Sequence, residues 1–251
     1  MRALTALVSA IVLVALGFWS DAQEPPPDSF EAKLEAIDIE VRKQETSAEK
    51  LEDRYLALLE GDLTPEQRGL VYVHIIDIGR YCRVSGDVQE AYALEALSYP
   101  LAAVDAVTMH AARAGILRGR YSDWRGERYA VGRRRILDAA LAGLKLALDS
   151  GAPSQPVALP GIGKMGRDRP TEEQIRRHAT EVAERREAER LQRLWGLRRG
   201  MSQTCAEIYS RPPVAPEELR ARASEVLEDY PEAVQDIMDK LEEILKRRRG
   251  E

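Results

Sequence analysis

Residues 64–100 read TPEQRGLVYVHIIDIGRYCRVSGDVQEAYALEALSYP, and the start and stop signals in this stretch predict two helices joined by a tight turn. Thr64 and Gln67 can satisfy each other's backbone N–H groups in a capping box. Gly86 interrupts the apolar run, and Pro100 closes the second helix because the residue before a proline resists the α conformation. The stretch is therefore expected to form a helical hairpin, with helices at about 64–83 and 88–98.

The rest of the chain also has helical periodicity. Apolar residues recur at alternating spacings of four and three in the segment 29–60, and a thin apolar stripe runs through the segment 171–209. Sustained period-two alternation is not found in any segment, so strands are not expected. The sequence predicts an all-α fold, in which antiparallel helical hairpins are flanked by long N- and C-terminal helices. The further helices are expected at about 29–60, 104–117, 134–149, 171–209, 216–229 and 231–247.

The apolar stripes of the two long helices are narrow. A narrow stripe can lie against another helix of the same chain or pair with a second chain. Between 171 and 209 the alternation of arginine and glutamate also indicates i,i+4 pairing on an exposed helix. Packing within the chain and formation of a homo-oligomer therefore both remain open. In the 29–60 helix the stripe consists of Phe30, Leu34, Ile37, Val41, Ala48, Leu51, Tyr55 and Leu58, with Gln44 as a polar member.

Small residues in the first hairpin follow the spacing of a helical repeat. Gly79 lies midway through the first helix, and Ala91 lies early in the second. A fainter second unit contains Gly115, 36 residues after Gly79, followed by Ala140 in its second helix. Small residues at such positions let two helices approach closely.

This pattern, over roughly residues 66–149, resembles the tetratricopeptide repeat, a 34-residue pair of antiparallel helices. The second unit is lengthened by an insertion, RGRYSDWRGERYAVGRR. The chain also resembles exported bacterial proteins of this length to which no activity is assigned. The resemblance implies a scaffold of stacked hairpins that presents a concave surface to a peptide or a partner helix, with the outer helices as caps.

Residues 1–22 have the layout of a secretory signal peptide. Arg2 precedes an apolar run from Ala3 to Trp19, and Ser20 and Ala22 occupy the −3 and −1 positions of a cleavage site. The run has 17 residues, at the short end of what spans a bilayer, so an uncleaved anchor is the alternative. In both cases the remaining chain is expected outside the cytoplasm, in the periplasm or the extracellular space. A membrane contact is expected only through this segment, where it is retained.

Proline and glycine divide the remaining chain. Residues 23–28, QEPPPD, form an extended leader because proline disfavours helix. Residues 150–170 contain four prolines and four glycines, which is typical of a linker or loop. The expected division is a helical-hairpin region at 29–149 and, after the linker, a charged long helix with C-terminal helices at 171–251.

Cys82 and Cys205 are the two cysteines of the chain. In an oxidising compartment they can pair and close a long loop, which is worth about 4–5 kcal/mol by the chain-entropy relation. The alternative is two separate buried thiols, because each cysteine has apolar helical neighbours.

A catalytic or metal-binding pattern is not recognisable. His74, His110 and His178 occur singly, without the spacing of a metal motif. GIGKMG at 161–166 matches G-x-G-x-x-G, but a proline precedes it where a strand should end, so it reads as part of the linker. A serine in a G-x-S-x-G turn is also missing. The sequence therefore predicts no catalytic residue, no cofactor and no metal.

Arginines and aromatic residues alternate between 118 and 135, where seven arginines face only Asp123 and Glu127. Guanidinium groups bind anions and aromatic rings supply apolar area, so this composition favours a recognition surface. The net charge of −5 and export argue against nucleic acid. A protein partner or an anionic envelope component, polymer or phospholipid, is expected instead. The candidate surface residues are Arg118, Arg120, Tyr121, Trp124, Arg125, Arg128 and Tyr129.

The same arginines have an alternative role inside the chain. Residues 23–62 carry 12 acidic and five basic groups, so the arginines can face the acidic first helix. The function predicted is that of an exported, non-catalytic helical scaffold that binds another macromolecule. The alternatives are a self-associating, coiled-coil-like structural component of the envelope and, third, an enzyme without a recognisable motif.

Overall fold

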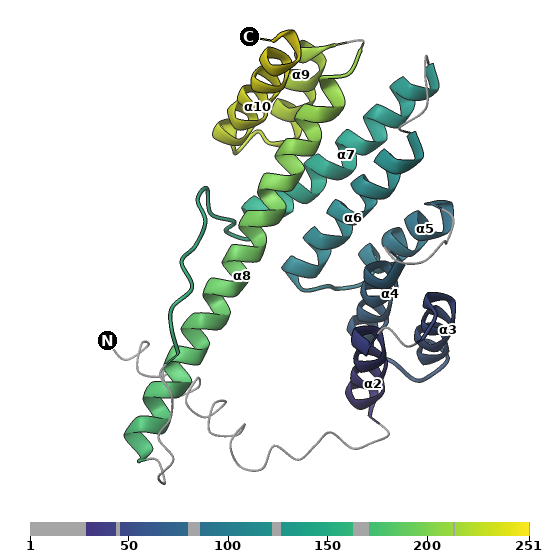
Figure 1. Cartoon of the computed structure of the whole chain (residues 1–251), viewed down its shortest axis with the longest axis vertical. Helices are drawn as coiled ribbons and strands as arrows, with labels where there is room; N and C mark the ends of the chain where they lie inside the picture. The colour runs from purple at the N-terminus through teal and green to yellow at the C-terminus, as the bar shows by residue number, and fades with distance from the viewer. Residues whose placement is uncertain are drawn as a thin grey trace.

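The computed structural model describes residues 29–43, 46–79, 86–121, 127–162, 171–212 and 214–250. Within these ranges every regular element is an α-helix, which confirms the predicted all-α class (Figure 1). The helices are α2 (Phe30–Lys43), α3 (Ala48–Leu58), α4 (Pro65–Gly79), α5 (Gly86–Leu97), α6 (Ala103–Tyr121), α7 (Glu127–Asp149), α8 (Glu172–Tyr209), α9 (Pro216–Val226) and α10 (Pro231–Arg249).

The segment predicted as one helix at 29–60 forms two helices instead. α2 ends at Lys43, and α3 begins after Ser47, whose backbone is extended, with φ −64° and ψ 147°. Serine and threonine favour helix starts over helix interiors because their side chains compete for backbone groups. The two halves of the apolar stripe therefore fold towards each other, and Ile37 and Tyr55 share one buried cluster.

The predicted capping box at Thr64 is present, and a second capping box begins α8. Gln67 N–H donates to Thr64 Oγ1 at 3.2 Å, and Thr64 N–H donates to the Gln67 side chain at 3.0 Å. At the start of α8, Thr171 and Gln174 make the same pair of bonds, at 3.3 and 2.8 Å. Each box satisfies backbone N–H groups that a helix start leaves without partners.

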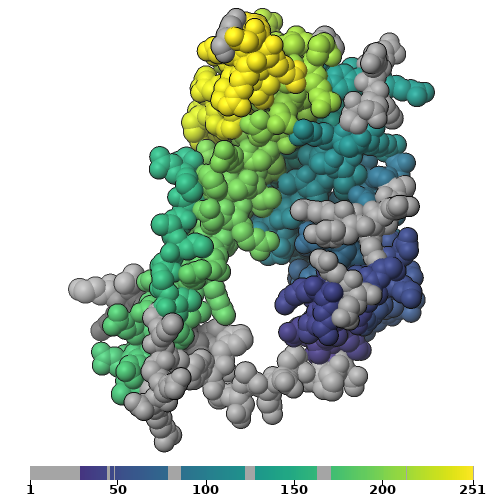
Figure 2. Space-filling view, in the orientation of Figure 1, coloured from purple at the N-terminus to yellow at the C-terminus, as the bar shows by residue number. Residues whose placement is uncertain are grey.

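Helices pack mainly on their neighbours in sequence, from α2 against α3 to α7 against α8. The first helices of successive hairpins also touch, since α2 contacts α4, α4 contacts α6, and α6 contacts α8. Among the second helices of the described residues, a contact of similar extent is found only between α7 and α9. We call the surface carried by α2, α4, α6 and α8 the inner face. Figure 2 shows the molecule open on this side, between the N-terminal half of α8 and α2.

The buried side chains form three clusters in series. Helices α2 to α4 share one cluster around Ile37 and Tyr55, and α4 to α6 share a second around Met109. The largest cluster joins α6 and α7 to α8, α9 and α10, and includes Leu144 and Ile237. Residues on both sides of the predicted linker therefore contribute to one core.

Gly143 of α7 lies where three helices meet. A Cβ atom at this position would lie 2.6 Å from His110 Cβ on α6 and 2.5 Å from Met201 Sδ on α8. Ordinary contacts between carbon atoms are 3.5–4.0 Å. The absence of a side chain at Gly143 therefore allows α6, α7 and α8 to approach this closely.

Residues 150–162 lie along α8, and we call this segment the strap (Figure 1). Side chains of α8 hold it through its backbone. The bonds are Arg185 Nη1 to Pro160 O at 3.0 Å, Arg190 Nη1 to Ser150 O at 3.4 Å, Arg198 Nη1 to Ala152 O at 3.0 Å, and Val157 N–H to Gln192 Oε1 at 2.7 Å. In the described part of the chain, no helix combines the length and the apolar character that crossing a bilayer requires.

Candidate functional site

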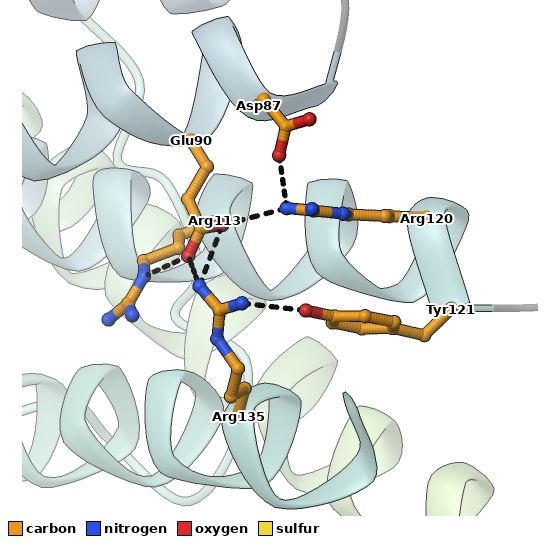
Figure 3. Close-up of polar contacts among 6 residues, drawn as sticks. All are labelled: Asp87, Glu90, Arg113, Arg120, Tyr121 and Arg135. Atoms are coloured by element: carbon orange, nitrogen blue, oxygen red, sulfur yellow. Dashed lines mark hydrogen bonds and ion pairs between the residues drawn. The ribbon is translucent and has the colours of Figure 1, made fainter. Parts of the chain in front are cut away.

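The arginine-rich segment builds a polar cluster around Glu90 of α5, whose residue surface is only 4% exposed (Figure 3). Arg135 Nη2 of α7 donates to both carboxylate oxygens of Glu90, at 2.8 and 3.0 Å. Arg113 Nε of α6 donates to the same carboxylate at 3.3 Å. Arg120 Nη1 lies 3.7 Å from it and also pairs with Asp87. Three guanidinium groups thus surround one carboxylate, which allows its charge to be buried.

The two tyrosines of the predicted surface are buried. Arg135 Nη1 donates to Tyr121 Oη at 2.6 Å, and the ring of Tyr121 fills the space beside Gly132. Tyr129 Oη donates to the carbonyl of Ile208 on α8 at 3.3 Å. These rings hold the end of the α6–α7 hairpin together and present little area to a partner.

Two further arginines of the segment are paired inside the molecule. Arg118 Nη1 lies 2.6 Å from a carboxylate oxygen of Glu207 on α8. The Arg133 guanidinium lies over the Tyr209 ring at 4.3 Å and donates to Glu218 of α9 at 3.0 Å. Internal pairing is therefore extensive. Its acidic partners lie on α5, α8 and α9 in the described residues, and not in the acidic first helix that the sequence suggested.

Part of the predicted surface remains exposed. Arg128 and Arg134 are exposed at the start of α7, and Val131 between them has 60% of its surface exposed. Trp124 and Arg125 lie outside the described residues. The exposed remainder of the arginine-rich segment is thus one side of the first turns of α7.

A second polar cluster lies on the inner face, around His74 of α4. Asp38 Oδ1 of α2 lies 2.9 Å from His74 Nδ1 and accepts the Tyr55 hydroxyl of α3 at 2.7 Å. Burial and the hydrogen bond to Asp38 raise the pKa of Tyr55 well above its usual value, so the phenol remains a donor. The contact between Asp38 and Nδ1 holds the imidazole in one orientation.

This cluster lines a hollow of about 400 Å³ between α2, α3 and α4. An oriented imidazole can accept and release a proton, and the aliphatic side chains add an apolar wall. The lining residues are Asp38, Val41, Arg42, Tyr55, His74, Asp77 and Ile78.

Asp105 of α6 extends the charged inner face towards α8. Burial raises the pKa of Asp105, while the positive charge of Arg193 on α8 and the imidazole of His74 lower it. The negative charge of Asp77 raises the pKa of Asp105 further. Charged groups of α4 and α8 thus influence the protonation of Asp105.

Cys205 of α8 is a fully buried free thiol in the largest core cluster. Burial raises the pKa of this thiol to about 12. Cys82, its predicted partner, lies outside the described residues, as does most of the glycine-rich GIGKMG stretch. The predicted bridge between Cys82 and Cys205 therefore stays a prediction.

Sequence reasoning missed the His74 cluster because it missed the break between α2 and α3. In a single helix, positions 38 and 55 lie about 25 Å apart along the axis, so they cannot share a partner. The break has a local signal, since Thr46 and Ser47 stand together and residues of this kind favour helix starts over helix interiors. Recognising this pattern as a helix start predicts the hairpin that brings Asp38 and Tyr55 together.

Comparison with known proteins finds no family model that matches the chain, no similar curated protein and no similar solved structure. The hairpin array and its two polar clusters are therefore the basis for inferring a function.

Proposed function

We propose that this protein is an exported, non-catalytic helical scaffold, similar in architecture to tetratricopeptide-repeat proteins, that binds a polypeptide partner along its inner face. The contact between first helices of successive hairpins, from α2 through α4 and α6 to α8, carries the proposal. Such an order leaves a continuous concave surface of first helices. Repeat proteins use surfaces of this kind to bind peptides and partner helices.

The distribution of ion pairs favours the inner face over the arginine-rich end as the polypeptide contact. At the arginine-rich end, Glu90 is surrounded by arginines of its own chain. On the inner face, Asp77 and Asp105 have no ion pair with any described residue. Charged groups that have no ion pair among the described residues can form hydrogen bonds and ion pairs with a second molecule.

The N-terminal sequence supports a location outside the cytoplasm for this partner. The segment 1–22 has the layout of a signal peptide, with small residues before the expected cleavage after Ala22. The partner is therefore sought among polypeptides of the periplasm or the cell surface.

Site-specific photocrosslinking in cells that make the protein tests the proposal. A benzoyl-phenylalanine replaces Asp77 on the inner face and, as a matched control, the exposed Leu94 on α5, a second helix. We expect a discrete polypeptide adduct from position 77 and not from position 94. Equal adducts at both positions, or adducts at position 94 alone, contradict binding along the inner face.

Self-association is the second candidate function, and it is restricted to α8. The apolar stripe of α2 and α3 is already used inside the chain, because Ile37 and Leu51 are buried. The N-terminal half of α8 keeps a partly exposed stripe that includes Val182. Light scattering separates the two candidates: a scaffold of the proposed kind is monomeric, whereas a dimer that dissociates on Val182→Asp favours self-association.

A further inference from the structure

We propose that the exposed side of the first turns of α7 docks on an anionic phospholipid surface. This inference goes beyond the proposed polypeptide binding, since it uses a different surface of the molecule. It follows from the placement of one exposed apolar side chain among arginines.

Val131 has 60% of its surface exposed, the largest fraction among the exposed large apolar side chains of the described residues. Arg128 lies three positions before Val131, and Arg134 and Arg135 lie three and four positions after it. Residues at these spacings are neighbours on one side of a helix. Arg128 and Arg134 are exposed, and Arg135 is partly exposed. Val131 therefore has arginines at the neighbouring positions before and after it on this side of α7.

The charge is positive on the side of α7 that faces α5 and α6. Arg113 and Arg120 join Arg135 at the Glu90 carboxylate, which lies beneath them with only 6% of its side chain exposed. Three arginines lie there against the carboxylates Asp87 and Glu90. Arg134, which follows Val131 by three positions, lines a hollow with Glu218, Arg222 and Glu225 of α9. Because Glu90 fixes arginines of two helices, part of this positive charge is held in place before any ligand arrives.

The apolar side chain favours a lipid surface over a soluble polyanion. A phosphate polymer is attracted by arginines alone and gains little from a valine. At a bilayer, Val131 can enter the boundary between headgroups and acyl chains while the arginines remain with the phosphates. Each basic residue near an anionic membrane contributes about a fivefold gain in binding.

Vesicle sedimentation with the full chain tests the proposal. The vesicles consist of phosphatidylcholine, with or without a third of phosphatidylglycerol, and the measured quantity is the ratio of the two partition coefficients. The apolar run at 3–19 binds both vesicle types similarly, so the ratio isolates the contribution of the arginines. We expect a ratio well above one at low salt that falls as salt is raised.

Three variants locate the contact. Arg134→Gln is expected to lower binding to the phosphatidylglycerol vesicles about fivefold, and Val131→Ser roughly fivefold as well. Arg176→Gln, which removes an exposed arginine at the far end of α8, is the matched control and is expected to have little effect. Inorganic polyphosphate serves as the soluble polyanion, and its binding is expected to be the same for Val131→Ser and the unmodified chain.

The proposal is overturned by a ratio near one, or by equal losses for Arg134→Gln and Arg176→Gln. A loss for Arg134→Gln without any loss for Val131→Ser also overturns it, because that result identifies a surface for soluble polyanions. Circular dichroism of each variant checks that the helices are intact.

Discussion

Replacing Glu90 with glutamine tests how the arginine-rich end is held together. The substitution keeps the shape of the side chain and removes its charge, so three guanidinium groups lose their shared counter-ion. Removing one partner of a buried ion pair destabilises a protein by about 3–5 kcal/mol. The side chains of Arg113, Arg120 and Arg135 are 22%, 31% and 40% exposed, so water partly screens their repulsion. We therefore expect Glu90→Gln to lower the free energy of unfolding by about 2–3 kcal/mol.

Urea and thermal unfolding followed by circular dichroism measure this loss. The urea midpoint is expected to fall at unchanged slope, and Tm is expected to fall by roughly 4–12 °C for a chain of this size. Glu95→Gln, at an exposed position of the same helix, is the matched control. Its effect is expected to stay within about 0.5 kcal/mol.

The sign of a second substitution makes the test stricter. Arg135→Gln is expected to destabilise the unmodified chain, because it removes two hydrogen bonds to Glu90. In the Glu90→Gln background the same change removes repulsion between arginines, so it is expected to be neutral or stabilising. Equal losses from Arg135→Gln in both backgrounds, or a Glu90→Gln effect no larger than that of Glu95→Gln, refute the described cluster.

Three further predictions concern the helix junction, the inner face and the buried thiol. Gly143→Ala is expected to lower the free energy of unfolding by about 1–3 kcal/mol, because the added methyl group overlaps with α6 and α8. Gly196→Ala has open space around it and is expected to raise the free energy of unfolding by up to about 1 kcal/mol in the same urea titration. Burial raises the pKa of Asp105, so its contribution to stability is complete below its unfolded pKa of about 4 and is lost as pH rises through the folded pKa. Asp105→Asn is therefore expected to raise Tm near neutral pH and to have little effect in acid. An unchanged or lowered Tm near neutral pH would count against a destabilising burial of Asp105. In a Cys82→Ser variant, the Cys205 thiol is expected to react with a thiol reagent only after unfolding, because burial raises its pKa to about 12. Labelling of the native protein at the rate of an exposed cysteine would contradict the burial of Cys205.

Local signals in the sequence predict most helix positions well. The capping boxes at Thr64 and Thr171 lie where the sequence places them, because all the atoms involved are within three residues of one another. The insertion after Arg118 was harder to interpret. α6 extends to Tyr121 and α7 begins at Glu127, so the described residues of the insertion form the end of α6 and the start of α7. Arginine-rich helix ends carry little apolar periodicity, and their helical state depends on partners far away in the sequence.

Long-range pairing limited the prediction of the candidate sites. The composition of the arginine-rich segment indicates that its charges need partners, but the identity of those partners depends on which helices are adjacent. Glu90 resembles any other carboxylate of an amphipathic helix until α5 is placed against α6 and α7. Likewise, the contact between Asp38 and His74 requires that α2 fold back at Ser47 and then lie beside α4.

The arrangement of the core as three clusters in series has a consequence for how this molecule loses its structure. In the described residues the first cluster is linked to the last through α4, α5 and α6, so opening of α2 and α3 removes few contacts from the C-terminal half. Amide protons of the N-terminal helices then exchange with solvent through a small opening event, whereas those of α7 exchange only when the largest cluster melts. Cooperativity in this chain is thus graded from one terminus to the other, and the N-terminal end can rearrange around a ligand while the C-terminal end keeps its form.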